Sequence, residues 1–403
     1  MRNLTHFLNY TYVIFVLLWD PLHITIITLD AKQLGITILT IVVFLINFIT
    51  SQKFKQFLFS KPIIFWGIWV IFSCINLKIS GYDGELPYSA YIILELFSPF
   101  LTMLIVCLEL FYNHKKILHT LFAVFCIYGL FTSFLSTGLE SSTEEQNLGA
   151  LGNLGALNTI FIIFYGSLLN THKWLKTRSL FFYIAISSSL VIMLATRKAF
   201  GAALIMIIFA VLSQINISIK NFGKLIVLSL VIIYSINLVL SNTLMGKRLT
   251  NTAEVGQKFN TTDNETLNFL GDRAFYYIEG WNIFLENPLT GIGLNNFTKE
   301  SGTNYRIHSE YMVQLTEGGI IGSAFFLLFY LWIFRNLYKR LKENNDEALK
   351  VITGGFIAII FINLTAWTYA FPHYFTCFGI IIGYLKYYDV PKSVLNYKNN
   401  HLN

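Results

Sequence analysis

The stretch IHSEYMVQLTEGGIIGSAFFLLFYLWIF, residues 307–334, changes from polar to apolar chain within a few helical turns. It opens with a histidine and a glutamate, passes Gln314 and Glu317, and continues as a run of apolar and small residues. About 20 mostly apolar residues are enough for a helix to cross the hydrocarbon core of a bilayer. We therefore predict a transmembrane helix at 311–334 that carries polar groups at one membrane surface.

The composition extends this prediction to the whole chain. Hydrophobic residues make up 55% of the 403 residues and charged residues only 13%, whereas a soluble domain carries about 25% charged residues. The sequence thus predicts an all-α polytopic membrane protein with about twelve transmembrane helices. The predicted spans lie near residues 10–29, 34–50, 62–80, 90–112, 117–136, 150–170, 179–196, 199–218, 224–241, 311–334, 351–369 and 373–388.

The predicted loops are short, with one exception late in the chain. We expect about nine transmembrane helices in residues 1–241, one large extracytoplasmic loop at 242–310, about three transmembrane helices at 311–388 and a cytoplasmic tail at 389–403. The first span has no small-residue cleavage site after it, so we expect it to be a retained anchor rather than a removed signal peptide.

The distribution of basic residues predicts the orientation. With both termini in the cytoplasm, 19 of the 29 Lys and Arg residues fall on the cytoplasmic side, together with only four acidic residues. Cytoplasmic loops of membrane proteins carry such an excess of basic residues. The basic net charge therefore reflects membrane topology and does not indicate nucleic-acid binding.

The second half of the large loop predicts a helix of its own. This helix should begin near Asp272 and end before Asn287-Pro288. Its apolar positions recur at helical spacing, at Phe275, Ile278, Trp281, Phe284 and Leu285. An amphipathic helix outside the membrane is expected on the bilayer surface or over a cavity between spans. The following GIGLNN lacks the third glycine and the preceding strand of a dinucleotide-binding motif, so we reject that interpretation.

The cysteines indicate neither disulfides nor a metal site. All four fall inside or at the ends of predicted spans, and no CxxC motif is present. Disulfide frameworks and zinc sites need paired, closely spaced cysteines. We predict no metal site and no cofactor.

Three basic residues are candidates for binding an anion at the outer surface. Arg197 and Lys198 form a tight turn between two predicted spans on the side where basic residues are rare. Two cations at headgroup depth suit a phosphate or pyrophosphate, although both side chains can instead reach ordinary lipid headgroups. Arg273 follows Asp272 at the start of the loop helix, where free N–H groups also attract anions. The alternative for Arg273 is an exposed ion pair, for example with Glu279.

The polar residues of the opening stretch form a second candidate group. Glu310, Gln314 and Glu317 share one helix face through their spacing, and a polar stripe entering a membrane helix faces the protein interior or a wet cavity. Ser309 is explained as a helix N-cap. His308 is either an interfacial polar residue or, above such a cavity, a general base. The role of Glu310 stays open between orienting the imidazole and binding a sugar hydroxyl.

The glycines that follow predict close packing. Gly318, Gly319 and Gly322 lie deeper in the span, and their GxxxG spacing lets another helix backbone approach closely.

These motifs together resemble one known family. His308-Ser309, nine further residues and then Gly319-x-x-Gly322 is similar to the His motif of the O-antigen ligase and polymerase superfamily. Arg273, Trp281 and the stretch from Asn287-Pro288-Leu289 through Gly291-Ile292-Gly293 to Asn296-Phe297 resemble the loop signature of that family. Thr196-Arg197 resembles its Ser/Thr-Arg turn. The specific motifs occupy about 194–202 and 271–322.

The resemblance implies glycosyl transfer at the outer face of the bacterial cytoplasmic membrane, from a glycan linked to undecaprenyl pyrophosphate. His308 then matches the base that activates an acceptor hydroxyl. Arg197 and Arg273 match the pyrophosphate-binding arginines, and Lys198 supplements Arg197. The implied partners are the lipid-linked donor and acceptor, the bilayer, and flippase and chain-length regulator proteins. The activated donor needs neither ATP nor a metal ion, since two guanidinium groups neutralise the departing phosphate.

Three functions remain open at this point. A polysaccharide polymerase for O-antigen, capsule or exopolysaccharide is our main hypothesis, because no module for a protein acceptor is appended. A ligase that moves finished glycan to another acceptor shares the same motifs. A transporter or flippase of lipid-linked sugars would need functional charges near the membrane midplane and internal repeats. Only Glu95 and Asp20 favour the transporter.

Overall fold

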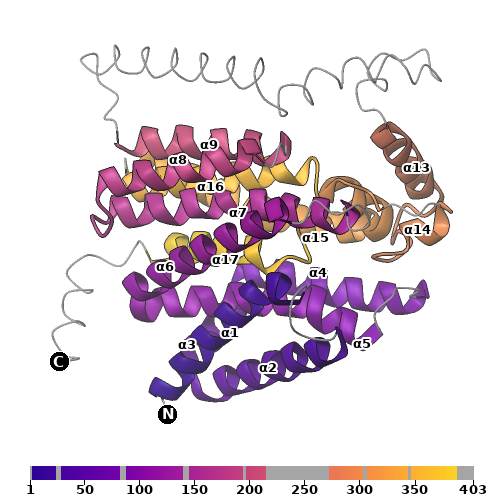
Figure 1. Cartoon of the computed structure of the whole chain (residues 1–403). Coiled ribbons are helices and arrows are strands. Elements are labelled where there is room, and N and C mark those ends of the chain that lie inside the picture. The colour runs from indigo at the N-terminus through magenta and orange to yellow at the C-terminus, as the bar shows by residue number, and fades with distance from the viewer. Residues whose placement is uncertain are drawn as a thin grey trace.

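The computed structural model describes residues 2–23, 29–81, 88–138, 145–193, 197–214, 272–302, 306–343 and 346–387. Every regular element within these ranges is helical (Figure 1), which confirms the predicted all-α class. The helices are α1 (Arg2–His23), α2 (Leu29–Thr50), α3 (Gln52–Leu58), α4 (Lys61–Ile79), α5 (Tyr88–Tyr91), η1 (Ile92–Phe97), α6 (Ser98–Gly138), α7 (Glu145–Thr171), α8 (Thr177–Met193), α9 (Arg197–Gln214), α13 (Asp272–Glu286), α14 (Phe297–Glu300), α15 (Glu310–Glu343), α16 (Glu347–Asn363) and α17 (Pro372–Tyr387).

The helices pack as layers around α6 and α17. Figure 1 shows α7, α8, α9 and α16 running side by side on one side of this pair, with α1 to α4 on the other. α13 and α14 lie together at one end of the bundle, and α13 packs against α15. The helix that the sequence predicts in the large loop is thus found as α13, and it ends directly before Asn287 as expected.

Three helices of the described residues are long and apolar enough to cross a membrane, and a fourth is counted if a bent pair forms one span. The three are Lys61–Ile79, Ile92–Gly129 and Glu310–Glu343, and the bent pair joins α2 and α3 at 109°. The chain is therefore a membrane protein by length and composition, while the number twelve stays a prediction. The predicted span 224–241 lies outside the described residues.

One reason for the lower count is that α6 runs through two predicted spans. Its 41 residues would extend about 61 Å as a straight helix, twice the thickness of a hydrocarbon core. Asn113 divides it with non-helical φ −147° and ψ 73°. This division falls between the predicted spans 90–112 and 117–136, where the sequence predicts a cytoplasmic turn.

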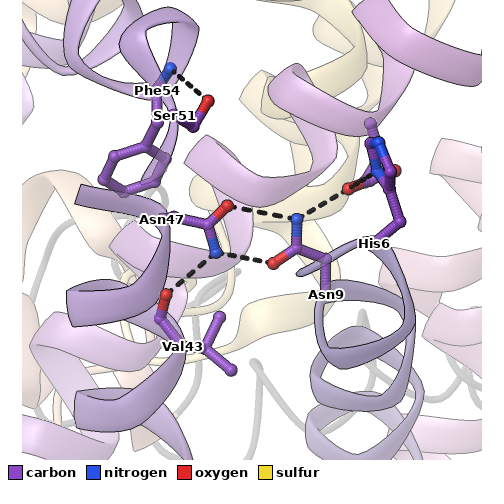
Figure 2. A network of polar contacts seen from close by, with 7 residues as sticks. His6, Asn9, Val43, Asn47, Ser51 and Phe54 are labelled. Carbon is purple, nitrogen blue, oxygen red and sulfur yellow. Dashed lines mark hydrogen bonds and ion pairs between the residues drawn. The ribbon is translucent and has the colours of Figure 1, made fainter. Parts of the chain in front are cut away.

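A buried polar network joins α1, α2 and α6 (Figure 2). The amides of Asn9 and Asn47 donate to each other, at 3.2 and 2.6 Å. Asn9 Nδ2 also donates to Glu109 Oε1 at 2.6 Å, and His6 Nδ1 lies 2.9 Å from both carboxylate oxygens. Ionisable groups inside membrane bundles are stabilised only when they are paired and hydrogen-bonded in this way. The network fixes how these three helices pack.

Candidate functional site

The helix that follows His308 is interrupted at Gly319. This residue has φ 60° and ψ −165°, which no α-helix contains. The ring centroids of Tyr311 and Phe326 lie 6.3 Å apart, although a straight helix separates residues fifteen positions apart by about 22 Å. The segment before Gly319 therefore folds back beside the segment after it. The predicted span 311–334 is bent, and its apolar pattern does not reveal the bend.

The loop after α13 binds the N–H groups that the interruption leaves free. Ile320 N donates to Pro288 O at 2.8 Å, and Ile321 N donates to Leu289 O at 3.1 Å. Irregular backbone within a membrane protein needs partners of this kind, because lipid offers none. The loop signature and the His motif of the sequence thus meet in the structure.

The same loop also satisfies the carbonyls on the other side of the interruption. Ile292 N donates to Thr316 O at 3.2 Å, and Gly293 N donates to Glu317 O at 2.9 Å. Asn76 from α4 adds a side-chain donor to Glu317 O at 3.1 Å. Residues 288–293 consequently run along the break in α15 with hydrogen bonds on both sides of it.

Two glycines are required for this close approach. Gly291 has φ +67°, and a Cβ added there would lie 2.5 Å from the backbone carbon of Glu317. Gly319 has φ +60°, and its Cβ would lie 2.5 Å from the backbone of Gly291 and Leu289. Real Cβ atoms do not approach backbone so closely, and side chains are unfavourable at positive φ. Only glycine at both positions allows the two backbones to touch.

The predicted close packing of helices is found at one of the three glycines. A Cβ on Gly322 would lie 2.9 Å from the ring of Phe72 in α4, so this glycine lets α4 approach. A Cβ on Gly318 would meet only ordinary contacts. At Gly319 the partner is a loop and not a second helix. The GxxxG interpretation therefore identifies the right segment but gives the wrong partner at Gly319.

The Glu317 side chain holds the end of the same loop. Its carboxylate accepts hydrogen bonds from the backbone N–H groups of Asn295, at 2.9 Å, and Phe297, at 3.3 Å. Asn295 has φ 65°, a left-handed conformation that asparagine tolerates better than most residues. Two backbone N–H groups, two positions apart, thus converge on the one carboxylate. Glu317 thereby orders the segment between the GIG turn and α14.

The Glu310 side chain is fully buried and binds the connection between α16 and α17. Its Oε2 accepts from the backbone N–H groups of Thr368 and Tyr369, the latter at 3.1 Å. Its Oε1 accepts from Gln314 Nε2 at 2.7 Å, and Gln314 Oε1 accepts from Trp69 Nε1 at 2.7 Å. Glu310 and Gln314 therefore join three separate parts of the chain. Whether these side chains and Glu317 also line a cavity stays a prediction.

His308 is the exposed residue in an otherwise buried segment. Ile307, Ser309 and Glu310 are 1%, 3% and 0% exposed, whereas His308 itself is exposed. Ser309 occupies the predicted N-cap position, since its carbonyl accepts from Val313 N at 2.9 Å. Its hydroxyl donates to Asn363 O at 3.4 Å. The backbone on both sides of the histidine is therefore fixed, while the histidine itself is exposed.

For the three predicted anion-binding residues, the structure gives the helix position of each but few side-chain contacts. Arg197 is the first residue of α9 and Arg273 the second residue of α13, so both stand at helix N-termini. Their side chains lie outside the described residues. Lys198 is half-buried. Helix N-termini carry free N–H groups and a favourable dipole for anions, so these positions suit the predicted pyrophosphate role, which stays a prediction.

Several residues of this site had no role in the sequence analysis. Trp69 meets Gln314 across 245 positions, and Thr368 and Tyr369 meet Glu310 across more than 50. Local periodicity gives no signal for such contacts. In the described part of the chain, no group of three or more His, Cys, Asp and Glu side chains is arranged to hold a metal ion.

Residues 182–327 match the family model of O-antigen ligase. This match confirms the resemblance to the O-antigen ligase and polymerase superfamily that the motifs predict. The matched segment contains α9, α13, the loop at 288–297, His308 and the interruption at Gly319. No curated protein matches the chain. Over residues 182–327 the chain is similar to O-antigen ligase, which indicates a membrane enzyme of the ligase or polymerase type.

Proposed function

We propose that this chain is a polysaccharide polymerase, and that it extends O-antigen, capsule or exopolysaccharide at the outer face of the bacterial cytoplasmic membrane. It would transfer a growing chain from undecaprenyl pyrophosphate to the non-reducing end of another lipid-linked repeat unit. The observation that carries the proposal is the exposed His308 between buried, hydrogen-bonded neighbours within the ligase-family segment. A base held in this way is positioned before substrate arrives.

The reaction needs one proton transfer and one displacement. The acceptor hydroxyl gives its proton to His308 while its oxygen attacks the anomeric carbon of the donor sugar. The bond from that carbon to the pyrophosphate oxygen breaks, and undecaprenyl pyrophosphate leaves with the electron pair. Direct displacement inverts the configuration at the anomeric carbon. The acceptor hydroxyl has a high pKa, so a positioned base accelerates its attack.

The basic residues would stabilise the leaving group. Arg197, Lys198 and Arg273 stand in the first turns of α9 and α13, where helix N-termini add to their positive charge. Charge that develops on the departing phosphate is best stabilised by groups already in place. We expect the reaction to need neither a metal ion nor a cofactor.

The test replaces His308 by alanine in a strain that lacks the native protein. We expect loss of the glycan ladder and accumulation of single lipid-linked units, because the acceptor hydroxyl is no longer deprotonated. The measurement is electrophoretic separation of lipid-linked glycans by length. His119, an exposed histidine of α6, provides the matched control, and His119→Ala should leave the ladder unchanged.

Two other results would change the assignment of the enzyme or of its base. Long lipid-linked chains that never reach their final acceptor would identify a ligase instead. An unchanged ladder in His308→Ala would remove the histidine from the mechanism.

A further inference from the structure

Glu95 lies in an irregular helical turn, and a proline that follows it explains the irregularity. It belongs to η1, a turn of π-helix at Ile92–Phe97, and Pro99 follows four residues later. A proline ring clashes with the carbonyl four residues before it, which here is the carbonyl of Glu95. The N–H of Ser98 accordingly bonds to Ile93 O, five residues back. Such widened turns occur frequently at functional sites.

Two tyrosines connect this turn to the His308 segment. The hydroxyl of Tyr91, directly before η1, lies 3.0 Å from the hydroxyl of Tyr369. The backbone N–H of Tyr369 donates to Glu310, two residues after His308. Both tyrosines are buried, at 1% and 4% exposure. The widened turn is thereby held against the connection between α16 and α17, next to the candidate base.

Arg306 packs against the same connection between α16 and α17. Its guanidinium carbon is 5.2 Å from the centroid of the Trp367 ring, in the range of cation–π contact. Two positions of extended chain span at most about 7 Å, so Arg306 is a close neighbour of His308. Within the described part of the chain, no hydrogen bond or ion pair occupies the N–H groups of Arg306. The ring orients the guanidinium plane while its donors stay available.

The ionisable groups that act on Arg306 are all acidic. Burial lowers the pKa of its guanidinium, but Tyr369, Glu95, Tyr91 and Glu317 more than offset this, so the pKa is raised above its usual value. The carboxylates of Glu95 and Glu317 thus both act electrostatically on the arginine. Glu317 binds two backbone N–H groups, and Glu95 belongs to the widened turn.

We propose that Arg306, Glu95 and Trp367 form the subsite that holds the acceptor sugar beside His308. This inference rests on the proposed function and names the substrate group that the site binds. A sugar offers hydroxyls that both donate and accept, which a guanidinium and a carboxylate match together. An aromatic ring adds contact with the apolar face of a sugar. A phosphate would be attracted by Arg306 but repelled by both carboxylates, so the mixed charge favours the neutral sugar.

The test separates acceptor from donor by using an acceptor that cannot donate. One repeat-unit oligosaccharide on a neutral alkyl chain has no pyrophosphate leaving group, and the native lipid-linked glycan serves as donor in reconstituted vesicles. For Arg306→Gln, Arg306→Lys and Glu95→Gln, we expect the KM of this acceptor to rise about tenfold. The KM of the donor should change less than about twofold. Glu286→Gln and Arg335→Gln, both at exposed positions, are the controls and should behave like wild type.

Other kinetic outcomes would overturn the inference. A raised KM for the donor with an unchanged KM for the acceptor would assign Arg306 to the donor phosphate. Unchanged constants for both substrates would show that these residues do not bind substrate.

A second measurement does not depend on turnover. In the His308→Ala background, the neutral acceptor should raise the unfolding temperature of the protein, followed by tryptophan fluorescence. It should not do so after the additional Arg306→Gln change, if that double variant melts like its parent without acceptor. Equal stabilisation of both proteins would contradict the subsite. Retained activity of His308→Ala alone would refute the proposed function. The binding result would still show whether Arg306 contacts the acceptor.

Discussion

At the scale of single residues, carboxylates hold the site together through backbone N–H groups. Glu317 binds Asn295 and Phe297 on one loop, and Glu310 binds Thr368 and Tyr369 on another. A carboxyl group has two oxygens, so it can accept from two N–H groups at once. Each glutamate thus fixes a loop against the helix that follows His308.

We predict that Glu317→Gln loosens the loop at 288–297. A glutamine amide has one acceptor oxygen, so one of the N–H groups of Asn295 and Phe297 loses its partner. The expected loss of stability is about 2 kcal/mol, measured as a lower unfolding temperature in detergent. Glu286→Gln at an exposed position of α13 is the control. A melting curve of Glu317→Gln identical to wild type would show that the carboxylate has no structural role.

Sequence spacing predicts at this scale which residues share a face, but not what they contact. The spacing predicts one polar stripe of Glu310, Gln314 and Glu317, and all three side chains are buried. Their partners are a tryptophan of α4 and two loops. A helical period carries no information about which distant segment covers a face, so Trp69 and Thr368 could not have been found.

At the scale of elements, the decisive feature is the contact between the GIG turn and the interrupted helix. The motif glycines were recognised from the sequence as a family pattern. Their physical reason appears only in the structure, where Gly291 and Gly319 touch through their backbones. An apolar run is compatible with both a straight and an interrupted helix, because its residues suit the membrane in either case.

We predict that Gly291→Ala and Gly319→Ala abolish glycan polymerisation. The added Cβ meets backbone at 2.5 Å in both cases, and backbone cannot rotate away as a side chain does. The readout is the glycan ladder together with the amount of protein in the membrane.

Gly302 provides a matched control for these two variants. It has φ +64° and no atom within 4 Å of an added Cβ, so Gly302→Ala isolates the cost of positive φ, about 1 kcal/mol. Gly302→Ala should keep its activity. Equal activity in all three variants would mean that the backbone contact is not required.

At the scale of the whole molecule, composition predicts the class of fold but not the order in which the helices pack. Composition predicted the helical class and the membrane environment, since both depend on the sum of many residues. The break in α6 at Asn113 falls between the predicted spans 90–112 and 117–136. The packing order around α6 and α17 was not predictable, because apolar faces are interchangeable by composition.

We predict that α14 faces the outside and the end of α15 faces the cytoplasm. In a cysteine-free background, Lys299→Cys should react with a membrane-impermeant maleimide in intact cells, because 19 of the 29 Lys and Arg residues fall on the opposite, cytoplasmic side. Lys339→Cys, whose side chain is 72% exposed, should react only after permeabilisation. Labelling of Lys339→Cys in intact cells would reverse the orientation and place His308 on the cytoplasmic side.

The interruption at Gly319 also bears on how the protein is made. Ile292 and Thr316, which are bonded across it, are separated by only 24 positions. Contacts between near neighbours in sequence form early, since little loop entropy opposes them. The contact between residues 288–293 and the interrupted helix α15 can therefore form while the ribosome is still adding α16 and α17. Glu310 gains its partners at Thr368 and Tyr369 only when the connection between α16 and α17 has been made, so the site is finished in a second step.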